Sequence, residues 1–185
     1  MTAASSVLAF AGRRIDAPDT SAARFPSQAV ARIERELAAL FEARAIRAVV
    51  GSAACGADIL ILEAARQRGL RTHIVLPFDA ARFRETSVVD RGAAWGPRYD
   101  LALAHAQQQG RVIVIPAGEG SDDDAYARAT EVIFEEAVEL ARELRCARAA
   151  LAVWDQNPRS SADATQQFLD LAKQQQFECL ELSTL

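Results

Sequence analysis

The sequence predicts an α/β fold, a Rossmann-like three-layer sandwich built on a mostly parallel sheet of five to six strands. Short apolar runs alternate with segments of helical periodicity along the whole chain. These runs are continuously apolar rather than alternating, which is typical of parallel strands buried on both faces. The length of 185 residues fits one domain that covers residues 1–185.

The first half of the chain predicts three strands, each followed by helical segments. Val30, Ile33 and Leu37 follow helical spacing, and Ser27 is placed to cap that helix. Gly69 is placed to end the next helix. The expected strands cover 7–10, 46–50 and 72–76, and the expected helices cover 30–41, 57–68, 82–89 and 95–108.

The second half predicts three more strands. Gly110 precedes the clearest of them, and Ser121 with the aspartates 122–124 resembles a helix start, where carboxylates complement the helix dipole. The expected strands cover 111–115, 149–154 and 179–182, and the expected helices cover 123–145 and 162–175.

Composition restricts the partners and the compartment. A net charge of −4 argues against nucleic acid as a partner. The chain has no apolar run near the ~20 residues that cross a bilayer, and residues 1–6 lack the features of a signal peptide. Three cysteines, an odd number, fit reduced thiols, so we expect a cytoplasmic protein with no membrane partner. His73 and His105 stand apart without clustered cysteines, so we expect neither a metal nor a cofactor.

The loops after the strands are where ligands of parallel α/β sheets bind, because all strand carboxyl ends meet at one edge. Gly12 ends the first strand and lets the backbone approach a ligand. Arg13 follows it and could reach a phosphate with its planar fork of donors; the alternative is a solvated turn residue.

The loop after the second strand carries the strongest ligand-binding pattern. Gly51 and Ser52 leave the strand, and Cys55, Gly56 and Ala57 open a helix. Free amides at such a helix start bind phosphate. The alternative is close packing of strand and helix that happens to require glycine. The pattern is neither a dinucleotide fingerprint nor a P-loop.

Other polar side chains near these strand ends have two interpretations each. Asp58 could cap helix amides, which is the favoured role, or accept hydrogen bonds from a ribose. Cys55 fits a packing residue better than a nucleophile, since no base is near it in sequence. Glu63 lies inside the helix, either solvated or turned toward the strand ends.

Three further strand ends add candidates. Pro77 and Phe78 follow the third strand, and Ser87 lies a little further on; we expect these residues to contact a base or a phosphate, or to form a packed lid. Asp155 follows the fifth strand, where it could contact a ribose or a base.

These segments resemble the SLOG superfamily, which includes the DprA DNA-uptake proteins and the Lonely Guy cytokinin-activating enzymes. The likeness runs from about residue 7 to residue 182 and is most specific at residues 51–60, which read Gly-Ser-Ala-Ala-Cys-Gly-Ala-Asp-Ile-Leu, followed by Leu76-Pro77-Phe78. The nearest branch looks like a group of nucleotide sensors. The resemblance implies a Rossmann-like fold, a nucleotide-derived ligand and a homodimer.

The enzymes of that superfamily carry a P-G-G-x-G-T-x-x-E loop that this sequence lacks. The corresponding stretch, residues 160–165, contains no glycine. We therefore expect binding or sensing of a nucleotide or nucleotide-derived phosphate ligand rather than catalysis. The alternatives are a phosphoribohydrolase or related N-glycosidase, with Glu63, Glu119 or Asp155 as its carboxylate, and a degenerate module for protein–protein contact.

Overall fold

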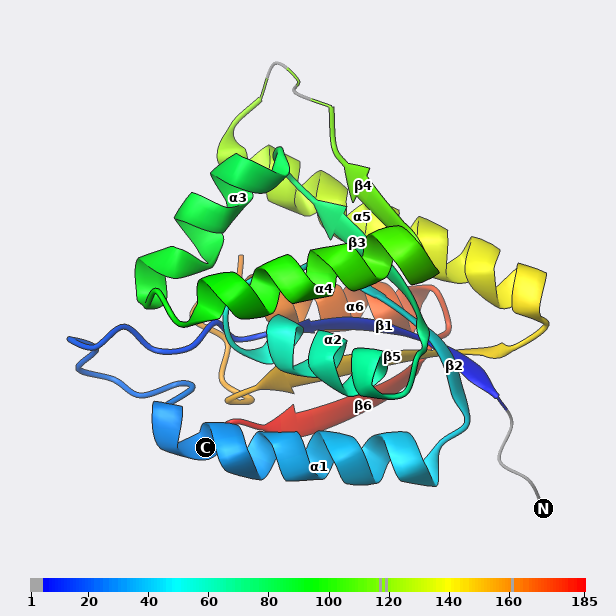
Figure 1. Cartoon of the computed structure of the whole chain (residues 1–185), viewed down its shortest axis with the longest axis horizontal. Helices are drawn as coiled ribbons and strands as arrows, with labels where there is room; N and C mark the ends of the chain where they lie inside the picture. Colours follow the sequence, from blue (N-terminus) through cyan, green and yellow to red (C-terminus); the bar gives the residue numbers. More distant parts are fainter. Residues whose placement is uncertain (1–4, 117, 119, 161) are drawn as a thin grey trace.

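The computed structural model describes residues 5–116, 118, 120–160 and 162–185. Within these residues one sheet of six strands forms, every pairing is parallel, and the order is β4-β3-β2-β1-β5-β6. The predicted α/β class with a five- to six-stranded sheet is therefore confirmed (Figure 1). The strands are β1 (Ser6–Gly12), β2 (Ile46–Gly51), β3 (Arg71–Leu76), β4 (Arg111–Val114), β5 (Ala147–Trp154) and β6 (Glu178–Ser183).

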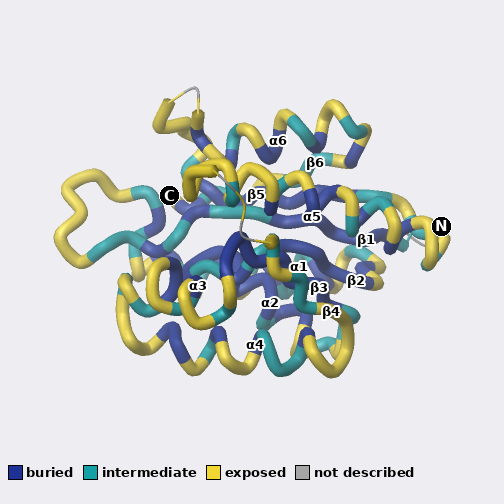
Figure 2. Tube along the Cα trace, turned by 90° about the horizontal axis from the view of Figure 1, so that it is seen from above, coloured by how far each residue is buried: buried dark blue, intermediate teal, exposed yellow. Residues whose placement is uncertain are grey.

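Two layers of helices cover the sheet. From β1 to β4 the chain moves outward in one direction, and right-handed connections place the intervening helices on one face. The chain then returns to the other side of β1, so the next two helices cover the opposite face (Figure 2). The first face carries α1 (Val30–Ala43), α2 (Ala57–Gln67) and α4 (Trp95–Gln109), with the short α3 (Ala80–Ser87) before α4; the second face carries α5 (Asp122–Leu144) and α6 (Ala164–Gln174).

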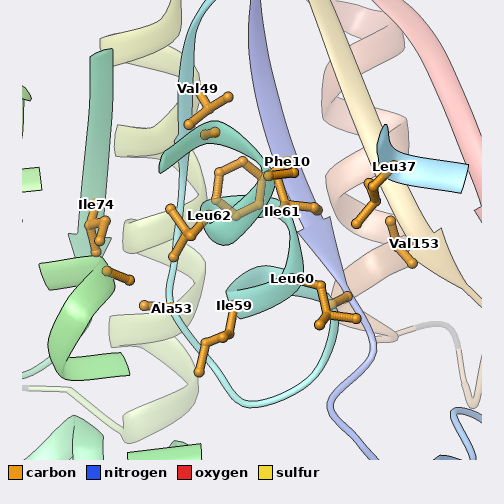
Figure 3. Close-up of a cluster of buried hydrophobic side chains, with 14 of the residues drawn as sticks. Phe10, Leu37, Val49, Ala53, Ile59, Leu60, Ile61, Leu62, Ile74 and Val153 are labelled. Atoms are coloured by element: carbon orange, nitrogen blue, oxygen red, sulfur yellow. The ribbon is translucent and has the colours of Figure 1, made fainter. Parts of the chain in front are cut away.

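The inner strands are largely apolar on both faces because each face has its own core. In β1, Leu8 and Phe10 pack into the core beneath α2, whereas Val7 and Ala9 pack into the core beneath α5 and α6. Figure 3 shows Phe10 beside the α2 side chains, and this helix is buried along most of its length.

Two of the predicted helix ends are confirmed and one is wrong. Ser121 caps α5, as predicted, and the structure adds a reciprocal capping box with Asp124. Gly69 follows α2 with a φ of 61°, the left-handed conformation that glycine favours. The predicted Ser27 cap is wrong: Ser27 opens a 3-10 helix (Ser27–Ala29), and its side chain makes no capping bond because Pro26 occupies the cap position.

The start of α6 also shifts. Helix α6 begins at Ala164 rather than at residue 162, because the Asp163 carboxylate accepts the Thr165 and Gln166 amides as its cap. Among the described residues, no helix combines the length and apolar character needed to cross a bilayer.

Candidate functional site

A cavity of about 540 Å³ opens at the carboxyl edge of the sheet, beyond β3 and β4 and beside the first turns of α5. Its wall includes the apolar side chains of Phe78, Val114 and Ile115 and several charged side chains. Such a volume suits a small organic ligand. The lining residues are Pro77, Phe78, Asp79, Arg82, Val114, Ile115, Pro116, Gly118, Gly120, Ser121, Asp122, Asp124, Ala125 and Arg128.

An aromatic and cationic stack forms the cavity wall at the start of α3. The guanidinium carbon of Arg82 lies 3.8 Å from the centroid of the Phe78 ring. Nη2 of Arg82 lies 2.9 Å from each carboxylate oxygen of Asp122, which holds the cation in place. Tyr126 packs edge-on against Phe78, with 5.4 Å between ring centroids. Phe78 and Arg82 therefore present a fixed planar surface to the cavity.

Two carboxylates of the cavity wall keep an oxygen available. Oδ1 of Asp79 accepts the amides of Ala81 and Arg82 at the start of α3. Oδ2 of Asp124 accepts the amide of Ser121 at 2.8 Å, and the hydroxyl and amide of Ser121 lower the pKa of Asp124. The second oxygen of each carboxylate has no hydrogen-bond partner among the described residues.

The second arginine of the cavity wall is also paired with carboxylates. Nη1 of Arg128 lies 2.8 Å from Glu131 and 2.9 Å from Glu135, both further along α5. All three side chains are exposed, so the pairs are weak.

The glycine-rich loop after β2 is packed against the protein itself. A Cβ at Gly51 would lie 2.4 Å from the ring of Phe10, and a Cβ at Gly56 would lie 2.5 Å from the Ile15 nitrogen. Gly56 also has a φ of 103°, which other residues rarely adopt. Both glycines thus serve close packing, the alternative that the sequence left open.

Two backbone amides around this helix start have protein partners. Ala57 donates its amide to the Arg13 carbonyl at 3.1 Å, and Cys55 donates to the Ser87 carbonyl at 3.0 Å. The sequence predicts free amides here that bind a phosphate. In this conformation these two amides already donate to backbone carbonyls, so they are not free to bind a phosphate.

Buried polar atoms lie next to that loop. Oδ2 of Asp58 accepts the Ala54 amide, so its carboxylate caps the loop rather than the helix. Three buried side-chain atoms have no hydrogen-bond partner in the described structure: Oδ1 of Asp58, Oγ of Ser52 and Nε of Arg14. Burial raises the pKa of Asp58 to about 7, against the opposing effects of the Ala54 amide and Arg14.

Cys55 is fully buried beside Arg14, whose Nη2 lies 3.6 Å from the thiol sulfur. Burial raises the pKa of this thiol more than Arg14 lowers it. The geometry supports the packing role over the nucleophile role.

A buried ion-pair cluster occupies the space between the ends of β1 and β5, where the strand order reverses. Nε of Arg13 lies 2.6 Å from Asp155, and Nη1 lies 2.8 Å from Asp163. A Cβ at Gly12 would lie 2.4 Å from the Cβ of Ala57 and 2.5 Å from the Val153 carbonyl oxygen, so glycine here allows β1 to approach α2 and β5 closely. Arg13 and Asp155, expected to hold a phosphate and a ribose, hold each other in this structure.

The remaining candidates are dispersed. Glu63 pairs with Arg98 of α4 through both carboxylate oxygens and does not line the cavity. Ser87 is buried, and its hydroxyl lies 2.8 Å from the hydroxyl of Tyr126. Pro77 and Phe78 do line the cavity. Glu119 lies outside the described residues.

The sequence predicts no nucleotide-binding role for Arg82, Asp124, Ile115 or Arg128, which form much of the cavity wall. The one feature of the sequence that could have indicated them is their position after β3 and β4, because the loops that follow parallel strands meet at the carboxyl edge of the sheet. Across the described residues, no group of three or more histidines, cysteines or carboxylates could hold a metal ion.

No protein-family model matches this sequence, and no curated protein matches it. Among solved structures, the chain is similar to the X-ray structure of DNA processing protein A (DprA) from Streptococcus pneumoniae, with 17% sequence identity and a TM-score of 0.33. The match covers 95% of this chain and 58% of that one, so this chain spans less than two thirds of that structure's length.

Proposed function

We propose that this protein binds a nucleotide or nucleotide-derived ligand at the carboxyl edge of its sheet, with the base and sugar in the cavity. The observation that carries the proposal is the cavity of about 540 Å³ beside the Phe78–Arg82 stack, a volume typical of small-molecule sites. The likeness of residues 51–60 to the SLOG superfamily supports the same class of ligand.

The cavity wall matches the two parts of a nucleoside. A planar base packs on the guanidinium of Arg82 and against the apolar wall at Val114 and Ile115. The available oxygens of Asp79 and Asp124 accept hydrogen bonds from ribose hydroxyls or from amino groups of the base.

The proposal is binding. Two of the carboxylates that the sequence offers for hydrolysis are held by arginines: Asp155 by Arg13 and Arg24, and Glu63 by Arg98. Neither carboxylate lines the cavity. Sensing and self-association as a homodimer stay predictions from the resemblance.

A thermal-shift screen tests the proposal. The probes are adenosine, guanosine, cytidine and uridine with their 5′-monophosphates. A ligand at about 100 times its Kd adds about 2.7 kcal/mol to the free energy of unfolding, and for a chain of this size that raises Tm by roughly 5–10 °C.

Two matched variants of α5 locate the site. Ala125→Leu fills part of the cavity, whereas Ala127→Leu adds the same volume at an exposed position outside the lining. We expect the first variant to lose the shift and the second to keep it. A Tm unchanged by every probe would exclude the proposed function and favour a module for protein contacts.

A further inference from the structure

We infer that the cavity selects a ligand of low negative charge, a nucleoside or a nucleotide with few phosphates, and discriminates against polyphosphates. The inference rests on the proposed function and narrows its ligand class. It is carried by the way the charged groups of the cavity wall are already paired.

The cations of the cavity wall are neutralised. Arg82 has both oxygens of Asp122 within 2.9 Å, and Arg128 has Glu131 and Glu135 within 3.0 Å. A phosphate that enters the cavity must displace one of these carboxylates or accept its repulsion.

The anions of the cavity wall are not neutralised in the same way. Asp79 and Asp124 bind only backbone amides and the Ser121 hydroxyl, and neither forms an ion pair in the described structure. With Asp122 they bring three carboxylates to the cavity against two arginines. Asp123 adds a further charge to the same helix turn.

Coulomb's law gives the size of the effect. Two like charges about 7 Å apart in a medium as polar as water weaken binding about threefold. Each phosphate charge added to the ligand should therefore raise Kd about threefold at low ionic strength, and salt should reduce the effect.

The experiment is a calorimetric titration of the full chain with each of the four nucleosides and its 5′-mono-, di- and triphosphate, without Mg²⁺. We expect Kd to rise from nucleoside to triphosphate by at least about tenfold in low salt, and the differences to shrink in ~0.5 M salt. A triphosphate that binds as tightly as its nucleoside overturns the inference and leaves the proposed function standing. If none of these ligands binds, both are overturned.

A charge-removing variant tests the assignment to these carboxylates. Asn caps helices as well as Asp does, so Asp79→Asn keeps the cap of α3. Asp124→Asn keeps a side-chain oxygen that can accept the Ser121 amide at the start of α5. The double variant therefore keeps both helix starts and removes two charges. We expect the ratio of triphosphate to nucleoside Kd to fall at least about threefold. The control Asp170→Asn removes an exposed carboxylate of α6 outside the cavity and should leave the ratio unchanged. An unchanged ratio in the double variant, confirmed as folded by its thermal transition, overturns the inference.

Discussion

The guanidinium carbon of Arg82 lies 3.8 Å from the ring centroid of Phe78, four residues earlier in the chain. The strand β3 ends just before Phe78, and Arg82 stands in the first turn of α3. The local turn from strand to helix therefore brings the two side chains together at the carboxyl edge, and both carboxylate oxygens of Asp122 of α5 accept hydrogen bonds from the cation.

Arg82→Met should weaken nucleoside binding about tenfold, because a cation over an aromatic face is worth about 1–2 kcal/mol when partly desolvated. The free energy of unfolding should change by less than ~1 kcal/mol, since the Arg82–Asp122 pair is half exposed. Calorimetry measures the first quantity and urea denaturation the second.

Arg84→Met is the matched control for that variant. Arg84 stands on the same helix, pairs with Asp100 at 2.9 Å and does not line the cavity. Equal losses of affinity in the two variants would contradict a direct contact between Arg82 and the ligand, and would indicate that both changes act through the position of α3.

Arg13→Met should destabilise the protein by about 3–5 kcal/mol, because it removes the buried cation that Asp155 and Asp163 share. The more exposed Arg24 and Arg159 then remain as their partners. Burial opposes ionisation of Asp163, but the Arg159 amide and Arg13 outweigh it and hold its pKa at about 2. The variant should raise that pKa, as followed by NMR titration.

The control for Arg13 is Arg142→Met, since Arg142 is exposed and pairs only with Glu139. We expect a change within ~0.5 kcal/mol there. A loss below ~1 kcal/mol in Arg13→Met would mean that the cluster is not a stabilising element of this fold.

Local patterns in the sequence were sufficient for the strands and helices. The inner strands β1, β2, β3 and β5 are largely buried on both faces, and their apolar runs are recognisable for that reason. The edge strands β4 and β6 contain no buried residue and follow the same pattern less closely. Strand order depends on contacts between segments far apart in the chain, which no local pattern encodes. For the same reason the partners of Arg13, 142 and 150 residues away, could not be predicted.

The glycine-rich loop shows a second limit of sequence reasoning. Glycine is required wherever backbone approaches another group closely, whether that group is a phosphate or a side chain. At Gly51 it is the ring of Phe10, and at Gly56 it is the backbone of Ile15. The same residue pattern therefore predicts two different environments, and only coordinates distinguish them.

His73→Gln should flatten the pH dependence of stability below pH 6.5. Burial lowers the pKa of His73, more than Glu136 raises it. Between that lowered pKa and 6.5 the unfolded chain binds a proton that the folded chain does not. The contribution of the neutral His73 to the free energy of unfolding is therefore fully present above pH 6.5. It is lost as the pH falls from 6.5 through the lowered pKa of the folded protein. Urea denaturation at several pH values measures this, and equal slopes in both proteins would contradict it.

Asp58→Asn should stabilise the protein at alkaline pH. Burial raises the pKa of Asp58 from 3.8 to about 7. A raised carboxyl pKa gives stability that is fully present below 3.8 and is lost as pH rises through about 7. At pH 8 the folded protein holds a buried carboxylate, at a cost of up to about 4 kcal/mol from the size of the shift.

The asparagine variant removes that charge and keeps an oxygen for the Ala54 amide, which Asp58 accepts at 3.1 Å. Its free energy of unfolding should exceed that of the native protein at pH 8 and approach it within ~1 kcal/mol at pH 4, where Asp58 is protonated. Urea denaturation across this range gives both curves. If the two curves of unfolding free energy against pH run parallel, the pKa of Asp58 is not raised in the folded protein. Oδ1 of Asp58, which has no hydrogen-bond partner in this structure, would then have a partner that stabilises its charge.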